Sequence, residues 1–417
     1  MSPAAFFSQG DRKMPKNTKK LRGMEILASE SKEKCEIPPL LGKDGAKEAR
    51  RFHKMLSAYN KTPLVSLGSL AKKLGVKDIL VKDESKRFGL NSFKGLGGSY
   101  AMFCILCREL GLDPEKADIG DLLTPSAREK IKNTVFVTAT DGNHGRGVAW
   151  AGSLFGCKVL VYMPAGSAEV RAEAIRIFGA EVTITELNYD NAVLLAKEQS
   201  EKYGWHLIQD TSHEGYEEIP TQIVQGYLTM ASEITKELDS TNILPTHLFL
   251  QAGVGAMAGG VLAYFADHYG KDKPLCAIVE PKEANCIYLS ALAADGNPRS
   301  VEGDPQTIMA GLNCGTPCSV TWPVLRDYAE FYISCEDFVA AGGMRLYADN
   351  GIISGESGAA TLGALEYILL RSNLRKELHL NENSVIVLVN TEGNTDPENY
   401  EAIVHGGKFS LPTNVGR

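Results

Sequence analysis

Residues 134–163 read TVFVTATDGNHGRGVAWAGSLFGCKVLVYM, and this stretch carries the pattern that decides the fold. TVFVTAT (134–140) and KVLVYM (158–163) are short apolar runs rich in β-branched residues, which is typical of buried strands. The segment between them starts with a polar, glycine-containing turn and continues as an amphipathic helix. A strand, a helix and a second strand in this order predict a parallel sheet covered by helices.

The same alternation extends in both directions along the chain. Further candidate strands are LVSL (64–67), DILVKDE (78–84), EVTITE (181–186), HLIQD (206–210), THLFLQ (246–251), LCAIVE (275–280), EFYIS (330–334) and SVIVLVN (384–390). This many strands fit two sheets better than one. We therefore expect an α/β protein with two open, mainly parallel twisted sheets flanked by helices. LTPSAREK (123–130) is expected to form a loop.

Composition excludes several classes of partner. The chain has 417 residues, enough for two or three domains at about 150 residues each. Its formal net charge of −7 argues against a nucleic-acid partner, and no apolar run reaches the roughly 18 residues that span a bilayer. Residues 1–24 are basic but show no apolar helical face, so we expect residues 1–45 to be a disordered tail rather than a transit peptide. The expected ligand is a small molecule.

The cysteines indicate a reducing setting. There are nine, an odd number without the density of a disulfide scaffold. Cys104 and Cys107 lie within the apolar run YAMFCILCREL, so core packing is favoured over redox or zinc chemistry. No second pair at zinc spacing follows Cys314 and Cys318, and we expect no metal site. A cytoplasmic location follows, although whether Cys286 and Cys314 pair stays open.

The first candidate site is RFGLNSFKGLGGSYA (87–101). Lys94 stands between a polar turn and an apolar helix, and the positive end of the helix dipole disfavours its protonated form. A lysine with a lowered pKa readily forms a Schiff base. On this segment alone, a solvated lysine at a helix start is the simpler interpretation.

The second candidate site is TATDGNHGRGVAWAG (138–152), where a strand ends in a turn before a helix. Asp141 offers a carboxylate for proton transfer, and Asn143 offers a donor and an acceptor to a ligand hydroxyl. His144 could act as a base, but we favour a histidine that caps the start of the helix. A turn with an Asx cap is an equally good interpretation of the segment alone.

The third candidate site is FLQAGVGAMAGGVLAYF (249–265), a strand followed by a glycine-rich turn and a helix. The backbone N–H groups of this turn can face one phosphate, with the helix dipole assisting. The residues concerned are Gly253, Val254, Gly255, Ala256 and Met257. The turn is also close to G-x-G-x-x-A, and Glu280 ends the next strand, so the motif alone supports a nicotinamide-dependent dehydrogenase nearly as well.

Together the three sites favour pyridoxal 5′-phosphate as the cofactor. A Schiff-base lysine, a polar loop for the ring and a glycine-rich turn for one phosphate are the parts that this cofactor requires. Open α/β sheets bind ligands at the carboxyl ends of their strands, where two of these segments begin. A dinucleotide enzyme would need neither the lysine nor the polar loop.

At this point the chain resembles the fold-type II pyridoxal-phosphate enzymes, the group of tryptophan synthase β and threonine dehydratase. NSFKGLGG is similar to the group's lysine segment, with Phe93 and Lys94 at the cofactor, and GVGAMAGG to its phosphate loop. TDGNHGRG resembles the loop whose asparagine, here Asn143, contacts the pyridoxal 3′-oxygen. SGESGAATLGAL (354–365) resembles a further helix start of the group. The resemblance implies a large cofactor-binding domain (46–98 and 232–417), a small domain (99–231) and an active site between them.

A closer resemblance is to the diaminopropionate ammonia-lyases. The matching strings are KDESKRFGLNSFKGLGGSYA, TATDGNHGRGVAWAG, QDTSHEGYEEIP, TIMAGLNCG, SGESGAA and NTEGNTD. They extend from about Tyr59 to about Lys408, nearly the whole of the part expected to be ordered. Matches to many segments in order are more specific than any single motif.

The resemblance implies the elimination of ammonia from 2,3-diaminopropionate, giving pyruvate and two ammonia molecules, by a homodimer. It assigns acid–base roles to Asp141 and Asp210, and leaves open which of them protonates the departing amine. Near the pyridine nitrogen it places Thr391, with Asn390 as the alternative. A serine or threonine dehydratase is the alternative within the same chemistry, but Asp141 replaces the usual serine and Leu96 the usual arginine of those enzymes.

Overall fold

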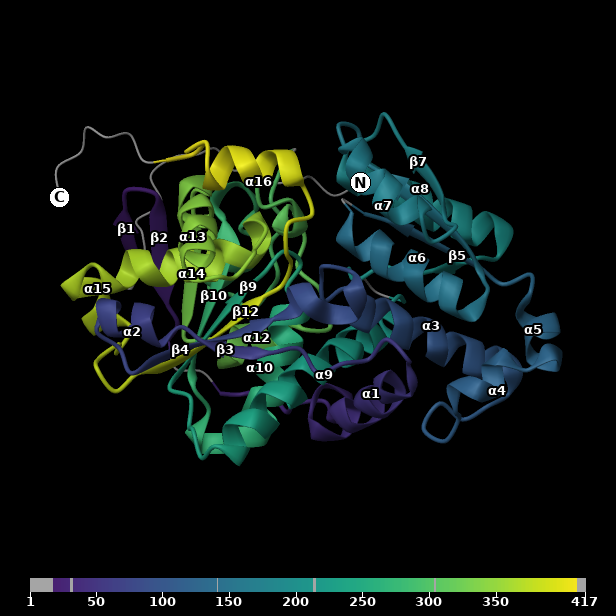
Figure 1. Ribbon diagram of the computed structural model, residues 1–417, viewed down its shortest axis with the longest axis horizontal. Helices are drawn as coiled ribbons and strands as arrows, with labels where there is room; N and C mark the ends of the chain where they lie inside the picture. The colour runs from purple at the N-terminus through teal and green to yellow at the C-terminus, as the bar shows by residue number, and fades with distance from the viewer. Residues whose placement is uncertain (1–17, 31–32, 141, 213–214, 304, 411–417) are drawn as a thin grey trace.

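The computed structural model describes residues 18–30, 33–140, 142–212, 215–303 and 305–410, and these form two sheets (Figure 1). The smaller sheet has four strands, and every neighbouring pair in it is parallel. Its spatial order is β7 (Glu181–Ile184), β6 (Lys158–Met163), β5 (Val135–Ala139) and β8 (His206–Leu207). The helices nearby in the chain are α3 (Gly95–Leu110), α4 (Ile119–Leu123), α5 (Pro125–Ile131), α6 (Asn143–Phe155), α7 (Glu169–Arg176), α8 (Tyr189–Tyr203) and α9 (Glu218–Ser240).

The larger sheet has eight strands, and its central pairs are parallel while its edges are antiparallel. Its spatial order is β1 (Thr18–Leu21), β2 (Met24–Ala28), β11 (Phe331–Cys335), β10 (Leu275–Pro281), β9 (His247–Gln251), β12 (Val385–Asn390), β4 (Asp78–Asp83) and β3 (Leu64–Ser66). Its remaining helices are α1 (Lys43–Met55), α2 (Gly68–Leu74), α10 (Ala256–Tyr269), α11 (Cys286–Ala293), α12 (Trp322–Tyr328), α13 (Asp337–Asp349), α14 (Glu356–Leu369), α15 (Ser372–Glu377) and α16 (Pro397–Val404). The expected α/β class with two sheets, mainly parallel, is confirmed.

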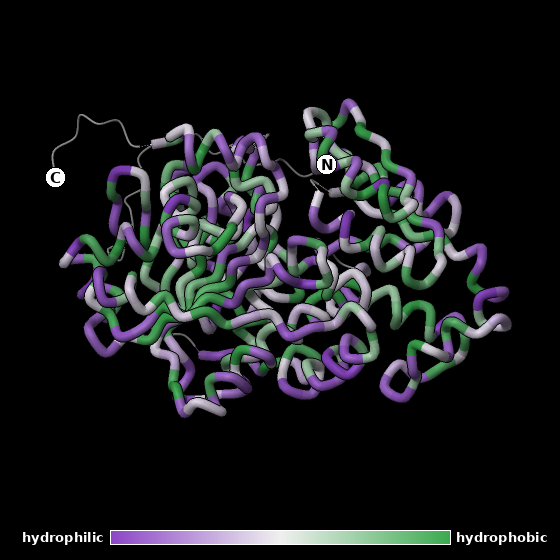
Figure 2. The backbone as a smooth tube through the Cα atoms, in the orientation of Figure 1, coloured by the Kyte–Doolittle hydropathy of each residue, from purple (hydrophilic) through white to green (hydrophobic). Residues whose placement is uncertain are grey.

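Helices cover both faces of the larger sheet, which explains why its central strands are apolar throughout. Successive side chains of a strand point to opposite faces. On β12, Val385, Val387 and Val389 join the apolar cluster that contains α9 and α10. Ile386 and Leu388 join the cluster on the other face, beneath α13 and α14. The strands at the centre of this sheet are correspondingly coloured mainly as hydrophobic in Figure 2.

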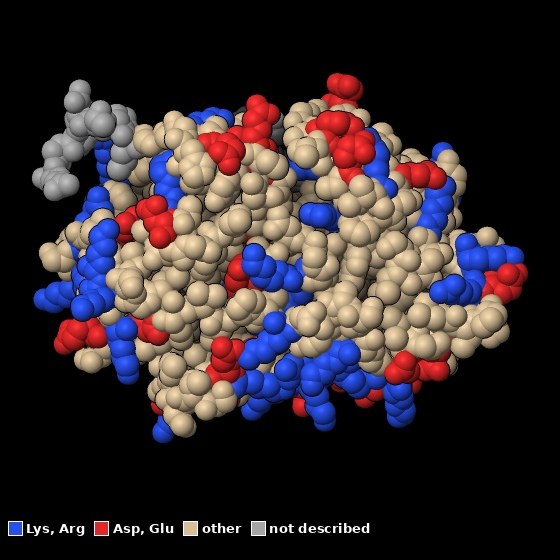
Figure 3. Space-filling view, viewed as in Figure 1, with Lys and Arg blue, Asp and Glu red and all other residues tan. Residues whose placement is uncertain are grey.

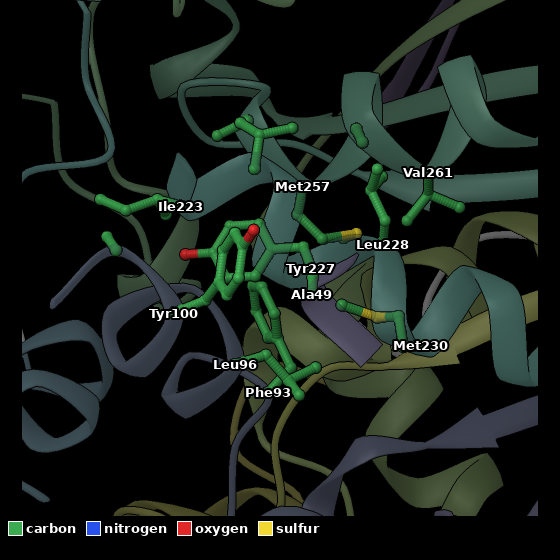
Figure 4. Packing of buried hydrophobic residues seen from close by; sticks show 14 of the residues in the cluster. Ala49, Phe93, Leu96, Tyr100, Ile223, Tyr227, Leu228, Met230, Met257 and Val261 are labelled. Carbon is green, nitrogen blue, oxygen red and sulfur yellow. The ribbon is translucent and has the colours of Figure 1, made fainter. Parts of the chain in front are cut away.

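Helices α3 and α9 cross closely, and two glycines permit the approach. A Cβ atom on Gly97 would lie 2.5 Å from the ring of Tyr227, and one on Gly226 would lie 2.5 Å from the carbonyl oxygen of Leu96. The ring of Tyr227 then packs edge-on against Phe93, with centroids 4.8 Å apart (Figure 4). This packing holds the start of α3, next to Lys94, against α9.

The prediction of a tail through residue 45 was wrong for residues 18–28, which form two strands, and for residues 39–45, where a 3-10 turn (Pro39–Leu41) leads into α1. Strand β2 pairs with β11, with Ile26 opposite Ile333, and β1 pairs in turn with β2. The apolar side chains of Met24 and Ile26 are buried in the core of the larger sheet, which stabilises this edge hairpin. Residues 1–17 lie outside the described part of the chain.

The expected loop at 123–130 was also wrong, because most of it forms α5. Thr124 is the N-cap, and its hydroxyl accepts a hydrogen bond from the backbone N–H of Ala127. Pro125 occupies the first helical position, where the missing N–H costs nothing. Ala127 and Ile131 then anchor the short helix in the interior. These signals are typical of a helix start.

The surface carries charges of both signs. Figure 3 shows acidic and basic side chains over the whole face, with basic ones gathered along the lower edge near α1 and α9. Within the described ranges, no helix combines the length and the apolar character needed to cross a membrane.

Candidate active site

A cavity of about 740 Å³, including its mouth, lies between the two sheets. It opens where strands of both sheets end, as the rule for open α/β sheets predicts. Nearly all of the described residues expected in the site line it: Phe93, Lys94, Asn143, Asp210, Gly253, Val254, Gly255, Ala256, Met257 and Thr391. Asn390 is not among the lining residues, and Asp141 lies outside the described part of the chain.

Lys94 immediately precedes helix α3 and forms an ion pair with Asp210 across the cavity. The preceding peptide is held in place because the N–H of Phe93 donates to the carbonyl of Thr391 over 3.2 Å. The ammonium group lies 5.3 Å from the ring centroid of Phe93 and 5.8 Å from that of Tyr227. The segments that meet here are far apart in the sequence.

The ion pair changes both pKa values in the direction that keeps it charged. Burial by itself lowers the pKa of Lys94, but the charge of Asp210 outweighs it, and that pKa is raised above its ordinary value. Burial raises the pKa of Asp210, but the charges of Lys94 and then His144 lower it to about 2. The expectation that the helix dipole lowers the pKa of Lys94 was therefore wrong, since the adjacent carboxylate is the stronger influence.

The glycine-rich turn forms an anion site at the start of α10. Gly255 has a φ of 86°, which an L side chain rarely adopts, and this conformation turns the chain from β9 into the helix. The N-cap position of α10 is Gly255 itself, which has no side chain to cap the helix. The first N–H groups of a helix have no partners within it, and here they adjoin the cavity. A Cβ atom on Gly253 would lie 3.1 Å from Cα of Leu312, so a larger residue would crowd this side of the turn.

Thr391 and Asn390 occupy different environments at the end of β12. The Thr391 hydroxyl accepts a hydrogen bond from Nε2 of Gln251 over 3.1 Å, so its own hydrogen remains to be donated into the cavity. The Asn390 amide donates to Asp83 over 2.9 Å and to the carbonyl of Ile353 over 3.1 Å, and its side chain is fully buried. The geometry favours Thr391 as the group that meets a ring nitrogen.

Asn143 begins α6, and its amide donates to the carboxylate of Glu392. His144 is buried, and its Nε2 lies 2.8 Å from the carbonyl oxygen of Ile208, so the ring holds the segment that leads to Asp210. Burial is the main cause of the lowered pKa of His144. These contacts fit a structural histidine, but the expected helix cap was wrong, because the ring binds the carbonyl of Ile208 and does not cap α6.

Glu280, the acid on which the dehydrogenase alternative relied, is buried away from the cavity. Its carboxylate accepts the backbone N–H groups of Ile287 and Tyr288 over 2.8 and 2.7 Å at the start of α11. Burial raises its pKa to about 8. A carboxyl group enclosed in this way cannot reach a ribose in the cavity.

Sequence reasoning missed several residues that line the cavity. Glu392 is the most notable, because a buried carboxylate beside a binding cavity is costly without a role. Its position directly after Thr391, at the end of a buried strand, was the available signal. Across the described residues, no group of three or more His, Cys, Asp or Glu side chains could hold a metal ion, and no disulfide is present.

Comparisons with known proteins agree with this geometry. Residues 55–392 match the family described as pyridoxal-phosphate dependent enzyme. The chain is 50% identical to a diaminopropionate ammonia-lyase of Salmonella typhimurium over 380 residues, which is 88% of this chain and 94% of the relative. It is 46% identical to the Escherichia coli K12 diaminopropionate ammonia-lyase over 389 residues, 90% of this chain and 95% of the relative.

Solved structures give the same result. The structure of the Escherichia coli ammonia-lyase in complex with D-serine superposes with a TM-score of 0.86 at 43% identity, covering 95% of this chain and 99% of that one. A complex of the same enzyme with an aminoacrylate–PLP reaction intermediate gives 0.85 at 44% identity, covering 93% and 98%. A tomato (Solanum lycopersicum) threonine deaminase shares the fold, with a TM-score of 0.70 at 20% identity over 93% of this chain and 98% of that one.

Proposed function

This chain belongs to the diaminopropionate ammonia-lyases, within the pyridoxal-phosphate dependent enzymes, and we propose that it converts 2,3-diaminopropionate and water to pyruvate and two ammonia molecules. The observation that carries the proposal is the pairing of Lys94 with Asp210 inside a cavity that also contains an uncapped helix start. A lysine and an acid for proton transfer therefore lie beside a phosphate site.

The residues present fit pyridoxal phosphate. The backbone N–H groups of residues 253–257 would hold its phosphate, the Thr391 hydroxyl its ring nitrogen and the Asn143 amide its ring oxygen, while Lys94 would bind its aldehyde. When bound, the cofactor supplies an electron sink for negative charge at the substrate Cα. A hydroxyl rather than a carboxylate at the ring nitrogen favours the unprotonated nitrogen.

The side chains divide the proton transfers between them. Lys94, as a neutral amine, takes the Cα proton of the L-isomer, and Asp141 takes that of the D-isomer, in which this proton lies on the opposite face of the substrate. Loss of this proton and of the β-amine leaves 2-aminoacrylate, which water converts to pyruvate and the second ammonia. The β-amine departs only when protonated, so an acid must stand near Cβ.

Asp210 is the better placed of the described carboxylates to protonate that amine. Its low pKa beside Lys94 would make it a poor acid alone. However, Lys94 becomes an ammonium when its neutral amine removes the Cα proton, and this ammonium can pass the proton to the departing amine by way of Asp210. The same proton then passes from Cα to the leaving group, and the pair returns to its starting state.

Substrate competition tests the proposal. Purified holoenzyme is given D- and L-diaminopropionate, serine and threonine side by side, and pyruvate or 2-oxobutyrate formation is followed. We expect at least one diaminopropionate isomer to have the highest kcat/KM, and Asp141→Asn to remove turnover of the D-isomer selectively. A higher kcat/KM for serine or threonine would instead establish a dehydratase, and intact D-isomer turnover in Asp141→Asn would contradict the role of Asp141.

The chain also divides into two domains. The cofactor-binding domain comprises residues 46–98 and 232–417, and the small domain comprises residues 99–231. This division is supported by the strands β5 to β8, which all lie within residues 99–231. The chain assembles as a homodimer, which light scattering would test. A cytoplasmic location is supported by the absence of disulfides among the described residues.

A further inference from the structure

Glu392 is a carboxylate built into the wall of the cavity. It follows Thr391 at the end of β12, and only 5% of its surface is exposed. It lines the main cavity and also a smaller adjoining one that includes Arg171, Gly311 and Asn143. The mechanism above gives it no task.

Its polar atoms connect three elements. Oε1 accepts the backbone N–H of Ser357 over 3.0 Å at the start of α14. Oε2 accepts the side-chain amide of Asn143 at the start of α6. Its backbone carbonyl accepts the N–H of Gly355 over 3.1 Å. One residue therefore links the larger sheet and α14 to α6, the helix that follows β5 of the smaller sheet.

The surroundings leave the carboxylate little freedom. A Cβ atom on Gly355 would lie 2.8 Å from Oε1 of Glu392, so the loop before α14 approaches it as closely as a glycine permits. The neighbouring Glu356 has a pKa raised to about 7, by burial first and by the charge of Glu392 second. The charge of Glu392 therefore adds to burial in disfavouring the ionised form of Glu356.

The contact decides how the Asn143 amide is turned. A terminal amide torsion has a broad, roughly two-fold preference, so its N and O ends exchange readily without a partner. A carboxylate can only accept hydrogen bonds, so Glu392 selects the orientation in which Nδ2 faces it. The amide nitrogen has two hydrogens, and Glu392 engages one, which leaves the other for the cavity that Asn143 lines.

We propose that Glu392 is a positioning residue that orients Asn143, so that the second amide hydrogen of Asn143 meets the ring oxygen of pyridoxal phosphate. The inference rests on the proposed function for the identity of the ring. Glu392 acts through Asn143 and does not itself touch the reacting atoms.

The test is a double-mutant cycle on the holoenzyme. Glu392→Gln keeps the shape but presents one oxygen instead of two, so it cannot accept from both Ser357 and Asn143. Wild type, Glu392→Gln, Asn143→Ala and the double variant are compared by the visible absorption bands of the bound cofactor and by kcat. Glu398→Gln, an exposed glutamate nearby, is the matched control.

We expect Glu392→Gln to change the ratio of the cofactor absorption bands and to lower kcat on the order of 10²-fold, as a small misplacement in an active site does. In the Asn143→Ala background the same substitution should change neither quantity, because its effect passes through Asn143. An unchanged spectrum in Glu392→Gln, or effects that multiply in the double variant, would overturn the inference.

If Glu392→Gln does not fold, Glu392→Asp replaces it in the same cycle. The shorter aspartate side chain can reach Ser357 or Asn143 but not both. Pyruvate formation by wild type is measured in parallel. If wild type turns over diaminopropionate but the double-mutant cycle shows no coupling between Glu392 and Asn143, only the role of Glu392 is rejected. If wild type shows the absorption bands of the bound cofactor but does not turn over diaminopropionate, the proposed function is rejected.

Discussion

At the scale of single residues, the contact between Lys94 and Asp210 is the centre of the site. The two residues are 116 positions apart in the sequence and come from the two sides of the cavity. Each holds the other in its charged form, because opposite charges at short range outweigh the effect of burial.

Replacing Asp210 by Asn should leave the cofactor bound but slow the reaction. We expect kcat for diaminopropionate to fall by about 10²- to 10⁴-fold, since the variant lacks a positioned acid–base group. Pyruvate formation measures the rate, and cofactor absorbance measures binding. The exposed Asp349→Asn is the matched control. A loss smaller than about twofold would remove Asp210 from the mechanism.

The residues that the sequence placed in the candidate site, and that line the cavity, are those whose signal is local. Lys94 before a helix and the glycines of 253–256 between a strand and a helix are recognisable within a few positions. The partners were not predictable in this way. Gln251 beside Thr391, and Glu392 beside Asn143, meet only after distant segments have packed together.

At the scale of elements, Glu280 shows how a strand end can stabilise the helix that follows. Glu280 is the last residue but one of β10. Its carboxylate caps α11 by accepting hydrogen bonds from two backbone N–H groups at the start of that helix. Burial nevertheless raises its pKa from an ordinary value of 4.5 to about 8. The folded state therefore binds a proton at this residue more tightly than the unfolded state does.

This difference predicts a pH dependence of stability. Between about pH 4.5 and about pH 8, Glu280 is protonated in the folded state and ionised in the unfolded state. The stabilising contribution of this bound proton to the free energy of unfolding is therefore fully present below that pH window and is lost as pH rises through it. Glu280→Gln does not titrate, so its free energy of unfolding relative to wild type should increase from about pH 5 to about pH 8. Urea unfolding at both pH values measures this. The exposed Glu283→Gln should follow wild type, and a difference that is constant with pH would contradict the assignment.

Most elements of the two sheets were predicted from apolar runs and their separation by amphipathic segments. The exceptions are instructive. The β1–β2 hairpin is short and lies in a segment with many charges, and its stability comes from pairing with β11, more than 300 residues away in the chain. Helix α5 was missed although Thr124 and Pro125 provide the N-cap and the first residue that are typical of a helix start.

At the scale of the whole molecule, a buried network of charges joins the segment before Lys94 to α9. Glu233 on α9 accepts hydrogen bonds from Lys82 over 2.6 Å and from Arg87 over 2.7 Å, and Arg87 also donates to Glu84 over 2.7 Å. All four side chains are fully buried. Two cations and two anions balance each other here, so removing one leaves an uncompensated charge.

Glu233→Gln should therefore lower the free energy of unfolding by about 3–5 kcal/mol, the usual effect of removing one partner from a buried ion pair. Glu237→Gln, one turn further along α9, breaks only the exposed pair with Lys61 and should cost about 0–1 kcal/mol. Denaturant unfolding of both variants makes the comparison. Equal effects of the two substitutions would show that the network does not stabilise the fold in this way.

The order of strands in the larger sheet was beyond sequence reasoning. Residues 18–28, 64–83, 247–281, 331–335 and 385–390 all contribute to one sheet, and local patterns do not specify which strands become neighbours. The same long-range pairing brings Thr391 beside the lysine segment. The cavity thus depends on the complete topology of both sheets.

Hydride trapping of the holoenzyme tests the central claim most directly. The protein is saturated with pyridoxal phosphate, reduced with borohydride, digested and mapped by mass spectrometry. We expect the phosphopyridoxyl mass on Lys94 and on no other lysine, with the exposed Lys86 unlabelled in the same region. A label on a different lysine, or no label in a protein that has bound the cofactor, would contradict the account.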